Sequence, residues 1–228
     1  MQKTKSEGDK LRSVHAGKTD VEIPVGNEFI RGTLTIPQNA KAIVVFAHGS
    51  GSGRFSPRNT YVAQLINTAD VATLLIDLLT ANEAEQDEYT GEYRFDVQKL
   101  AGRLLDATQW LKCNSQTQTL RMGYFGASTG AAAALIASAQ VPVEVKAVVS
   151  RGGRPDLAKE SLTKVRVPTL LIVGGKDTEV LRLNQEALRL ISAEKKLEVI
   201  SGATHLFEEP GKLEEAAALA LDWFKKYL

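Results

Sequence analysis

One serine of this chain lies in a motif that is typical of nucleophilic catalysis. Residues 123–130 read Gly-Tyr-Phe-Gly-Ala-Ser-Thr-Gly, which places Ser128 at the centre of a Gly-x-Ser-x-Gly pattern. An apolar run precedes the pattern and an alanine-rich segment follows it, so a strand, a sharp turn and a helix are predicted. Glycine on both sides leaves room for so tight a turn. The motif predicts an exposed serine nucleophile; the alternative is an ordinary glycine-rich turn.

A serine hydroxyl needs a base that removes its proton, and the chain contains three histidines. His15 lies in a polar N-terminal segment, and His48 ends an apolar run. His205 follows the last apolar run, so we expect it at the carboxyl edge of the sheet, where Ser128 also emerges. We therefore predict that His205 is the base; a helix-capping or packing histidine is the alternative.

The base needs an acid that orients its ring, and Asp177 is the candidate. It follows an apolar run and the turn Gly174-Gly175, directly before a predicted helix. A helix N-cap is therefore the alternative role, and Asp77 at another strand end competes for the same position. The order serine, aspartate, histidine along the chain is the order of α/β-hydrolases and differs from that of chymotrypsin and subtilisin. This order favours Asp177.

The tetrahedral intermediate of acyl transfer needs two N–H groups that bind its oxyanion. The first is predicted to be the amide of Thr129, directly after the serine, and the second to come from the run His-Gly-Ser-Gly-Ser-Gly at 48–53. Ser50 is the preferred donor, with Gly51 as the next choice. In this interpretation His48 braces the loop and is not the base.

Two arginines around glycines, Arg151 and Arg154, follow another predicted strand at the same sheet edge. A guanidinium pair of this kind can bind a carboxylate or a phosphate. Arg54 follows the predicted oxyanion loop and is expected to join the pair. We therefore predict these three arginines as substrate-binding residues for an anionic group. Surface positions, or salt bridges with Asp156 or with the acidic segment 81–94, are the alternative.

Short apolar runs alternate with helical patterns, which predicts an α/β fold with a mostly parallel, doubly wound sheet. Two alternating segments, 21–25 and 29–36, predict an antiparallel hairpin at the N-terminal edge. The expected buried strands are 42–47, 71–79, 120–125, 145–149, 168–173 and 197–200, and the expected helices are 57–69, 97–113, 128–140, 179–192 and 212–227. Residues 1–18 are predicted to be a polar tail and 19–228 one domain. The acidic segment 81–94 is expected to be a long loop, with a mobile lid as the alternative.

The composition excludes several classes of partner and cofactor. A net charge of +1 in 228 residues gives no reason to expect nucleic acid or a membrane surface as partner. A single cysteine, Cys113, suits a reducing compartment, and the first ten residues lack the apolar core of a secretory signal, so a cytoplasmic location is expected. No metal-binding or phosphate-loop pattern is present, so neither a metal nor an organic cofactor is predicted. The expected partner is a small-molecule ester, and a monomer and a homodimer both remain open.

Four segments together resemble the dienelactone hydrolase branch of the α/β-hydrolase superfamily: 46–52, 123–130, 171–177 and 202–205. The resemblance extends over about residues 20–227 and implies Ser128, Asp177 and His205 as a catalytic triad. The family's eponymous enzymes carry cysteine at the position of Ser128, so a serine esterase acting on small to medium carboxylic esters is expected here. Lactone or thioester hydrolysis and acyl transfer on the same triad are alternatives, and a catalytically silent binding module is a second one.

Overall fold

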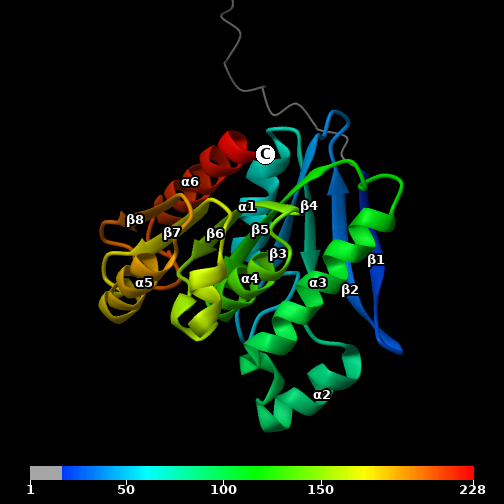
Figure 1. The fold of residues 1–228 in the computed structure, drawn as a ribbon, viewed down its shortest axis with the longest axis horizontal. Coiled ribbons are helices and arrows are strands. Elements are labelled where there is room, and N and C mark those ends of the chain that lie inside the picture. Colours follow the sequence, from blue (N-terminus) through cyan, green and yellow to red (C-terminus); the bar gives the residue numbers. More distant parts are fainter. Residues whose placement is uncertain (1–16) are drawn as a thin grey trace, which may run out of the picture.

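The computed structural model describes residues 17–228, which form one eight-stranded sheet flanked by helices (Figure 1). The strands lie in the order β1-β2-β4-β3-β5-β6-β7-β8. Their bounds are β1 Gly17–Val25, β2 Glu28–Ile36, β3 Ala42–Ala47, β4 Val71–Ile76, β5 Arg121–Ala127, β6 Val145–Arg151, β7 Thr169–Gly174 and β8 Lys195–Ile200. The helices are α1 Pro57–Asn67, α2 Ala81–Thr90, α3 Val97–Cys113, α4 Thr129–Gln140, α5 Thr178–Leu190 and α6 Lys212–Tyr227, with 3-10 segments η1 Tyr93–Phe95 and η2 Pro155–Lys164.

The sheet has the predicted topology. Strand β2 is antiparallel to both β1 and β4, whereas every pairing from β4 to β8 is parallel. Parallel strands need crossovers that place helices on the faces, and the strands β3, β4 and β7 are accordingly buried along their full length. The mostly parallel doubly wound sheet with an antiparallel N-terminal hairpin is confirmed.

Two apolar clusters fill the space between the sheet and its helices. One cluster packs α3, α4 and α5 against one face, and α3 and α4 lie in front of the sheet in Figure 1. The other packs α1 and α6 against the opposite face. The helix after the serine motif, α4, is buried over almost its whole length because its alanines allow close approach to the strands. The serine motif is therefore anchored in the centre of the molecule.

The acidic segment differs from its prediction: residues 81–90 are a helix and not a loop. Thr80 caps it, since its hydroxyl accepts the N–H of Glu83 while the Glu83 carboxylate accepts the N–H of Thr80. Gly91 ends it with a left-handed backbone at φ 67°. This capping box stabilises a helix whose acidic composition and lack of an apolar stripe suggested a loop.

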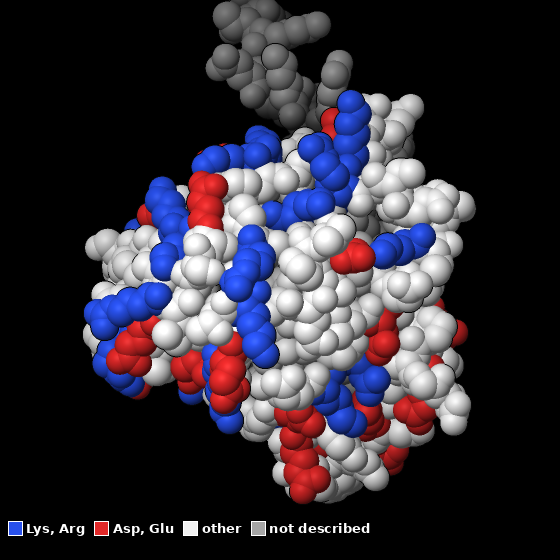
Figure 2. Space-filling model, in the orientation of Figure 1, with Lys and Arg blue, Asp and Glu red and all other residues white. Residues whose placement is uncertain are grey.

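The described part of the chain begins with β1, which includes Gly17 and Lys18 from the predicted tail. Residues 1–16, with His15, lie outside the described residues. Basic and acidic side chains are intermixed on the face shown in Figure 2. Within residues 17–228, no helix combines the length and the apolar character that a membrane span requires.

Candidate active site

Ser128 lies on a strained turn between β5 and α4. Its backbone has φ 50° and ψ −120°, a conformation that side-chain-bearing residues rarely adopt. A methyl group on Gly126 would lie 2.4 Å from the Cα of Ala131, and one on Gly130 would lie 2.4 Å from the carbonyl oxygens of Ala47 and His48. Both glycines are therefore required by close backbone contacts, and the turn presents Ser128 half-buried at the sheet edge.

His205 and Asp177 form a hydrogen-bonded pair at the same edge. The His205 Nδ1–H donates to Asp177 Oδ2 at 2.6 Å. This bond places the ring proton on Nδ1 and leaves the Nε2 lone pair able to accept a proton. Asp177 occupies the N-cap position of α5, yet its side chain makes no capping hydrogen bond there. Its carboxylate is thus committed to His205 and not to the helix.

Ser128 and His205 line one cavity of about 190 Å³, together with Ser50 and Arg151. Among residues 17–228, no hydrogen bond joins the Ser128 hydroxyl to His205. Catalytic hydrogen bonds are often long in ligand-free proteins and tighten when substrate binds. Gly152 allows β6 to approach the histidine, since a methyl group there would lie 3.0 Å from the His205 carbonyl oxygen.

The loop after β3 lies directly against the serine. A methyl group on Gly49 would lie 3.0 Å from the Cβ of Ser128. The next residue, Ser50, donates its N–H to the Thr129 hydroxyl at 3.0 Å. The two predicted oxyanion residues are therefore in direct contact, although the Ser50 amide has a protein partner in the free structure.

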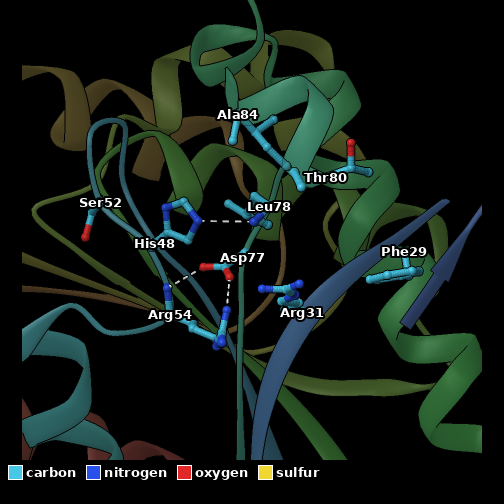
Figure 3. A pocket seen from close by; sticks show the side chains of 11 residues that line it. Phe29, Arg31, His48, Ser52, Arg54, Asp77, Leu78, Thr80 and Ala84 are labelled. Carbon is cyan, nitrogen blue, oxygen red and sulfur yellow. Dashed lines mark hydrogen bonds and ion pairs between the residues drawn. The ribbon is translucent and has the colours of Figure 1, made fainter. Parts of the chain in front are cut away.

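His48 and Asp77 hold this loop against the end of β4 (Figure 3). The His48 Nδ1–H donates to the Gly49 carbonyl at 2.9 Å, and His48 Nε2 accepts the N–H of Leu78 at 3.1 Å. Burial lowers the pKa of His48, which agrees with a neutral ring in both contacts. Asp77 accepts the backbone N–H of Arg54 at 2.8 Å and pairs with its guanidinium, so it does not contact His205.

Arg151 lines the cavity of Ser128 and is only 7% exposed. Its guanidinium donates to Asn59 Oδ1 at 3.2 Å, while its Nε and Nη1 atoms are buried without a partner. The rings of Phe125 and Phe207 lie 5.9 Å from its guanidinium carbon. Within residues 17–228, no carboxylate lies within ion-pair distance of it. Burial lowers the pKa of Arg151 to about 10, and the nearby Arg58 contributes to the shift.

The other two predicted substrate-binding arginines lie elsewhere. Arg154 forms a two-pronged ion pair with Asp156, at 2.8 and 2.9 Å, and does not line the cavity of Ser128. Arg54 is paired with Asp77 and lines neighbouring cavities. The pairing of Arg154 with Asp156 matches the salt-bridge alternative, whereas the partner of Arg54, Asp77, was not among the predicted partners. Neither arginine therefore has a free guanidinium beside the serine.

Sequence reasoning missed Asn59 and Arg58, which are among the residues that line this cavity. Both belong to the first turn of α1, which starts at the N-cap Ser56. A basic residue just after a helix start carries little signal, because such positions are usually exposed. Only the tertiary structure brings them to the serine, where Asn59 accepts a hydrogen bond from Arg151. No group of three potential metal ligands is found in the part of the chain that the structure describes.

Comparison with known proteins places this geometry in a family. The model of the dienelactone hydrolase family matches residues 30–228. The crystal structure of a dienelactone hydrolase from Anabaena variabilis is 54% identical, with a TM-score of 0.92 over 93% of this chain and 99% of that chain. An esterase of Pyrococcus furiosus, 20% identical with a TM-score of 0.78, covers 94% of both chains and shares the fold.

A relative from Mycobacterium tuberculosis has a different kind of name. It is provisionally named a phosphoribosyl transferase and is 54% identical over 209 residues. These cover 92% of this chain but 46% of the relative, so the chain spans about half the length of the curated relatives that it matches. The family match covers most of the chain, and the fold is the α/β-hydrolase fold. This chain belongs to the dienelactone hydrolase family of hydrolases.

Proposed function

We propose that this protein is a serine hydrolase that cleaves small to medium carboxylic esters through an acyl-enzyme. One observation carries the proposal: a strained, half-buried Ser128 opens into the same cavity as a histidine whose Nδ1–H is held by Asp177. Strain of this kind persists only where the surrounding structure fixes it, and it is concentrated at functional sites.

In the proposed mechanism, the Ser128 oxygen attacks the ester carbonyl while His205 Nε2 takes the hydroxyl proton. Asp177 keeps the ring in the correct tautomer and stabilises the imidazolium that forms. The tetrahedral intermediate collapses, its C–O bond breaks, and His205 gives the proton to the leaving alcohol. Water then attacks the acyl-serine with His205 again as base, which releases the carboxylic acid and restores Ser128.

The amides of Thr129 and Ser50 are the proposed oxyanion donors. In the free structure the Ser50 N–H donates to the hydroxyl of Thr129, the residue that directly follows the serine. We propose that the oxyanion takes over this N–H as it forms. Charge then develops beside the start of α4, where the helix dipole favours a negative group.

We further propose that the ester carries an anionic group that Arg151 binds. A buried guanidinium with two unpartnered nitrogen atoms is costly unless an anion completes it. Arg58 adds a second positive charge to the same cavity. A carboxylate or phosphate oxygen would satisfy the free Nη1 or the free Nε of Arg151 with a charge-assisted hydrogen bond. Lactones and thioesters with such a group remain alternative substrates of the same machinery, as does acyl transfer to an acceptor other than water.

The name of the mycobacterial relative describes a chain about twice as long, so we do not extend phosphoribosyl transfer to the matched half. We retain the cytoplasm as the proposed location, because the one cysteine suits a reducing compartment. A small molecule, and neither nucleic acid nor a membrane, is the proposed partner.

The test combines fluorophosphonate labelling with hydrolysis of p-nitrophenyl esters. We expect the probe to label wild type at Ser128 and the Ser128→Ala variant to lose about 10⁴-fold or more of kcat/KM. Ser115→Ala, at an exposed site, is the matched control. An unlabelled, folded wild type that hydrolyses no ester would favour a silent binding module and refute the proposal.

A further inference from the structure

Three neighbouring cavities follow the loop after β3. The first contains Ser128 and His205. A second, of about 290 Å³, lies between the loop and α2, and a third, of about 320 Å³, continues from there to β2. Ser52 lines all three cavities, and the second and third share His48 and the residues after β4. We refer to the second and third cavities together as the trench.

Helix α2 is a fixed roof over the trench. The Glu83 carboxylate accepts the N–H of Thr80 at 3.0 Å and pairs with Lys99 at 2.7 Å and Arg103 at 2.6 Å. The buried carboxylate of Asp87 accepts two backbone N–H groups of the following 3-10 segment at 2.7 and 3.0 Å. These contacts tie both ends of the helix to α3 and η1. The trench is therefore a preformed space, and binding there needs no ordering of the roof.

Six apolar side chains line the trench beside polar and charged ones. Figure 3 shows Ala84 on α2 and Thr80 at the N-cap of this helix, above the third cavity, and Phe29 on the strand beside it. The apolar residues that line the trench are Phe29, Leu78, Leu79, Ala81, Ala84 and Leu100. An aromatic ring and several aliphatic side chains around a preformed hollow favour a flat apolar ligand group.

The charged side chains around the trench are either ion-paired or exposed, in contrast to Arg151. Asp77 pairs with Arg54, and Asp87 pairs with Arg94 at 2.5 Å. Arg31 also lines the third cavity, but it is exposed, so water can solvate its guanidinium. The trench thus presents no buried charge that requires a counter-ion. It can accept a neutral apolar group at little cost in desolvation.

We propose that the part of the ester remote from the scissile bond is an apolar or aromatic group that lies in the trench beneath α2. This inference rests on the proposed ester hydrolysis at Ser128 and specifies its substrate class. Ala84 lines both cavities of the trench from the roof, so it sets the size of the group that fits. The substrate is an ester with an anion near Arg151 and a flat apolar body on the other side of the oxyanion loop.

The test fills the trench with one side chain and compares three neutral esters. Methyl acetate is the small reference, methyl 3-phenylpropanoate carries a phenyl group on the acyl side, and 3-phenylpropyl acetate carries it on the alcohol side. Ala84→Trp is compared with Glu85→Trp, which adds the same ring at an exposed position of α2 that lines no part of the trench. Urea unfolding verifies that both variants are folded.

We expect Ala84→Trp to lower kcat/KM about tenfold or more for one of the phenyl esters, while methyl acetate changes less than about twofold. The ester that is affected shows whether the acyl side or the alcohol side of the substrate occupies the trench. Phe29→Ala should lower the same value, and Phe95→Ala, an exposed aromatic outside the trench, should not. An equal change in kcat/KM for all three esters, or no change for either phenyl ester, would overturn the proposal that the trench binds substrate. By contrast, a folded wild type that the fluorophosphonate probe does not label, or activity that survives Ser128→Ala, would overturn the proposed function itself.

Discussion

Replacing Arg151 by methionine is expected to stabilise the protein and to weaken its action on anionic esters. Methionine has a similar length and no charge, so the variant removes a guanidinium that is 7% exposed and has two unpartnered nitrogen atoms. The fall of the Arg151 pKa to about 10 means that burial disfavours the charged form at neutral pH by roughly 3 kcal/mol. The lost hydrogen bond to Asn59 offsets about 1 kcal/mol of the gain.

The net expectation is a rise of about 2 kcal/mol in the free energy of unfolding, or about 4–8 °C in Tm for a chain of this size. The pKa of Arg151 is lower in the folded than in the unfolded state, so this destabilisation of wild type is present throughout the range below about pH 10. Urea unfolding at pH 7 measures the difference directly. Arg154→Met is the matched control, because Arg154 is paired with Asp156 and removing it should not stabilise the protein.

The same two variants test anion binding. Sodium phosphate or acetate should raise the Tm of wild type more than that of Arg151→Met, because only wild type presents the unpartnered guanidinium. The preference in kcat/KM for a p-nitrophenyl ester with a terminal carboxylate over its neutral methyl ester should fall about tenfold or more in Arg151→Met and stay unchanged in Arg154→Met. A less stable Arg151→Met variant with an unchanged preference would refute the reasoning.

Three further predictions concern the turn and its supports. Ser128→Gly should raise the free energy of unfolding by roughly 1 kcal/mol, because glycine adopts φ 50° without strain; urea unfolding that shows no gain would contradict this. Wild type should lose stability as the pH falls below about 6.5, because burial lowers the pKa of His48 and the unfolded chain takes up the proton. The free energy of unfolding of His48→Gln should depend less steeply on pH, and equal slopes for the two proteins would refute the assignment. Gly130→Ala should lower the free energy of unfolding by about 3 kcal/mol or more, because the added methyl group collides with the backbone. Gly102→Ala, with open space around it, should raise the free energy of unfolding by up to about 1 kcal/mol in the same assay, because alanine favours the helix α3.

The sequence by itself determined the layers of this protein and the strand ends that carry its chemistry. Continuous apolar runs alternating with helical patterns can be buried in few ways, so the parallel sheet and its N-terminal hairpin were predictable. The glycines beside Ser128 identified the sharp turn because no other residue fits there. A local pattern sufficed in these cases because the physical cause was local.

Tertiary packing alone decided the roles of the charged residues. Arg151, Arg154 and Arg54 look alike in the sequence, but two of them meet carboxylates and one is buried without any. Pairing depends on which side chains meet across the sheet edge, and Arg58 reaches the cavity of Ser128 only through the position of α1 in the fold. The acidic segment became a roof for the same reason: Glu83 and its neighbours find their cations on other elements. Spacing along the chain fixes where a strand ends, whereas the partner of a charge is set by contacts between residues that are distant in the sequence.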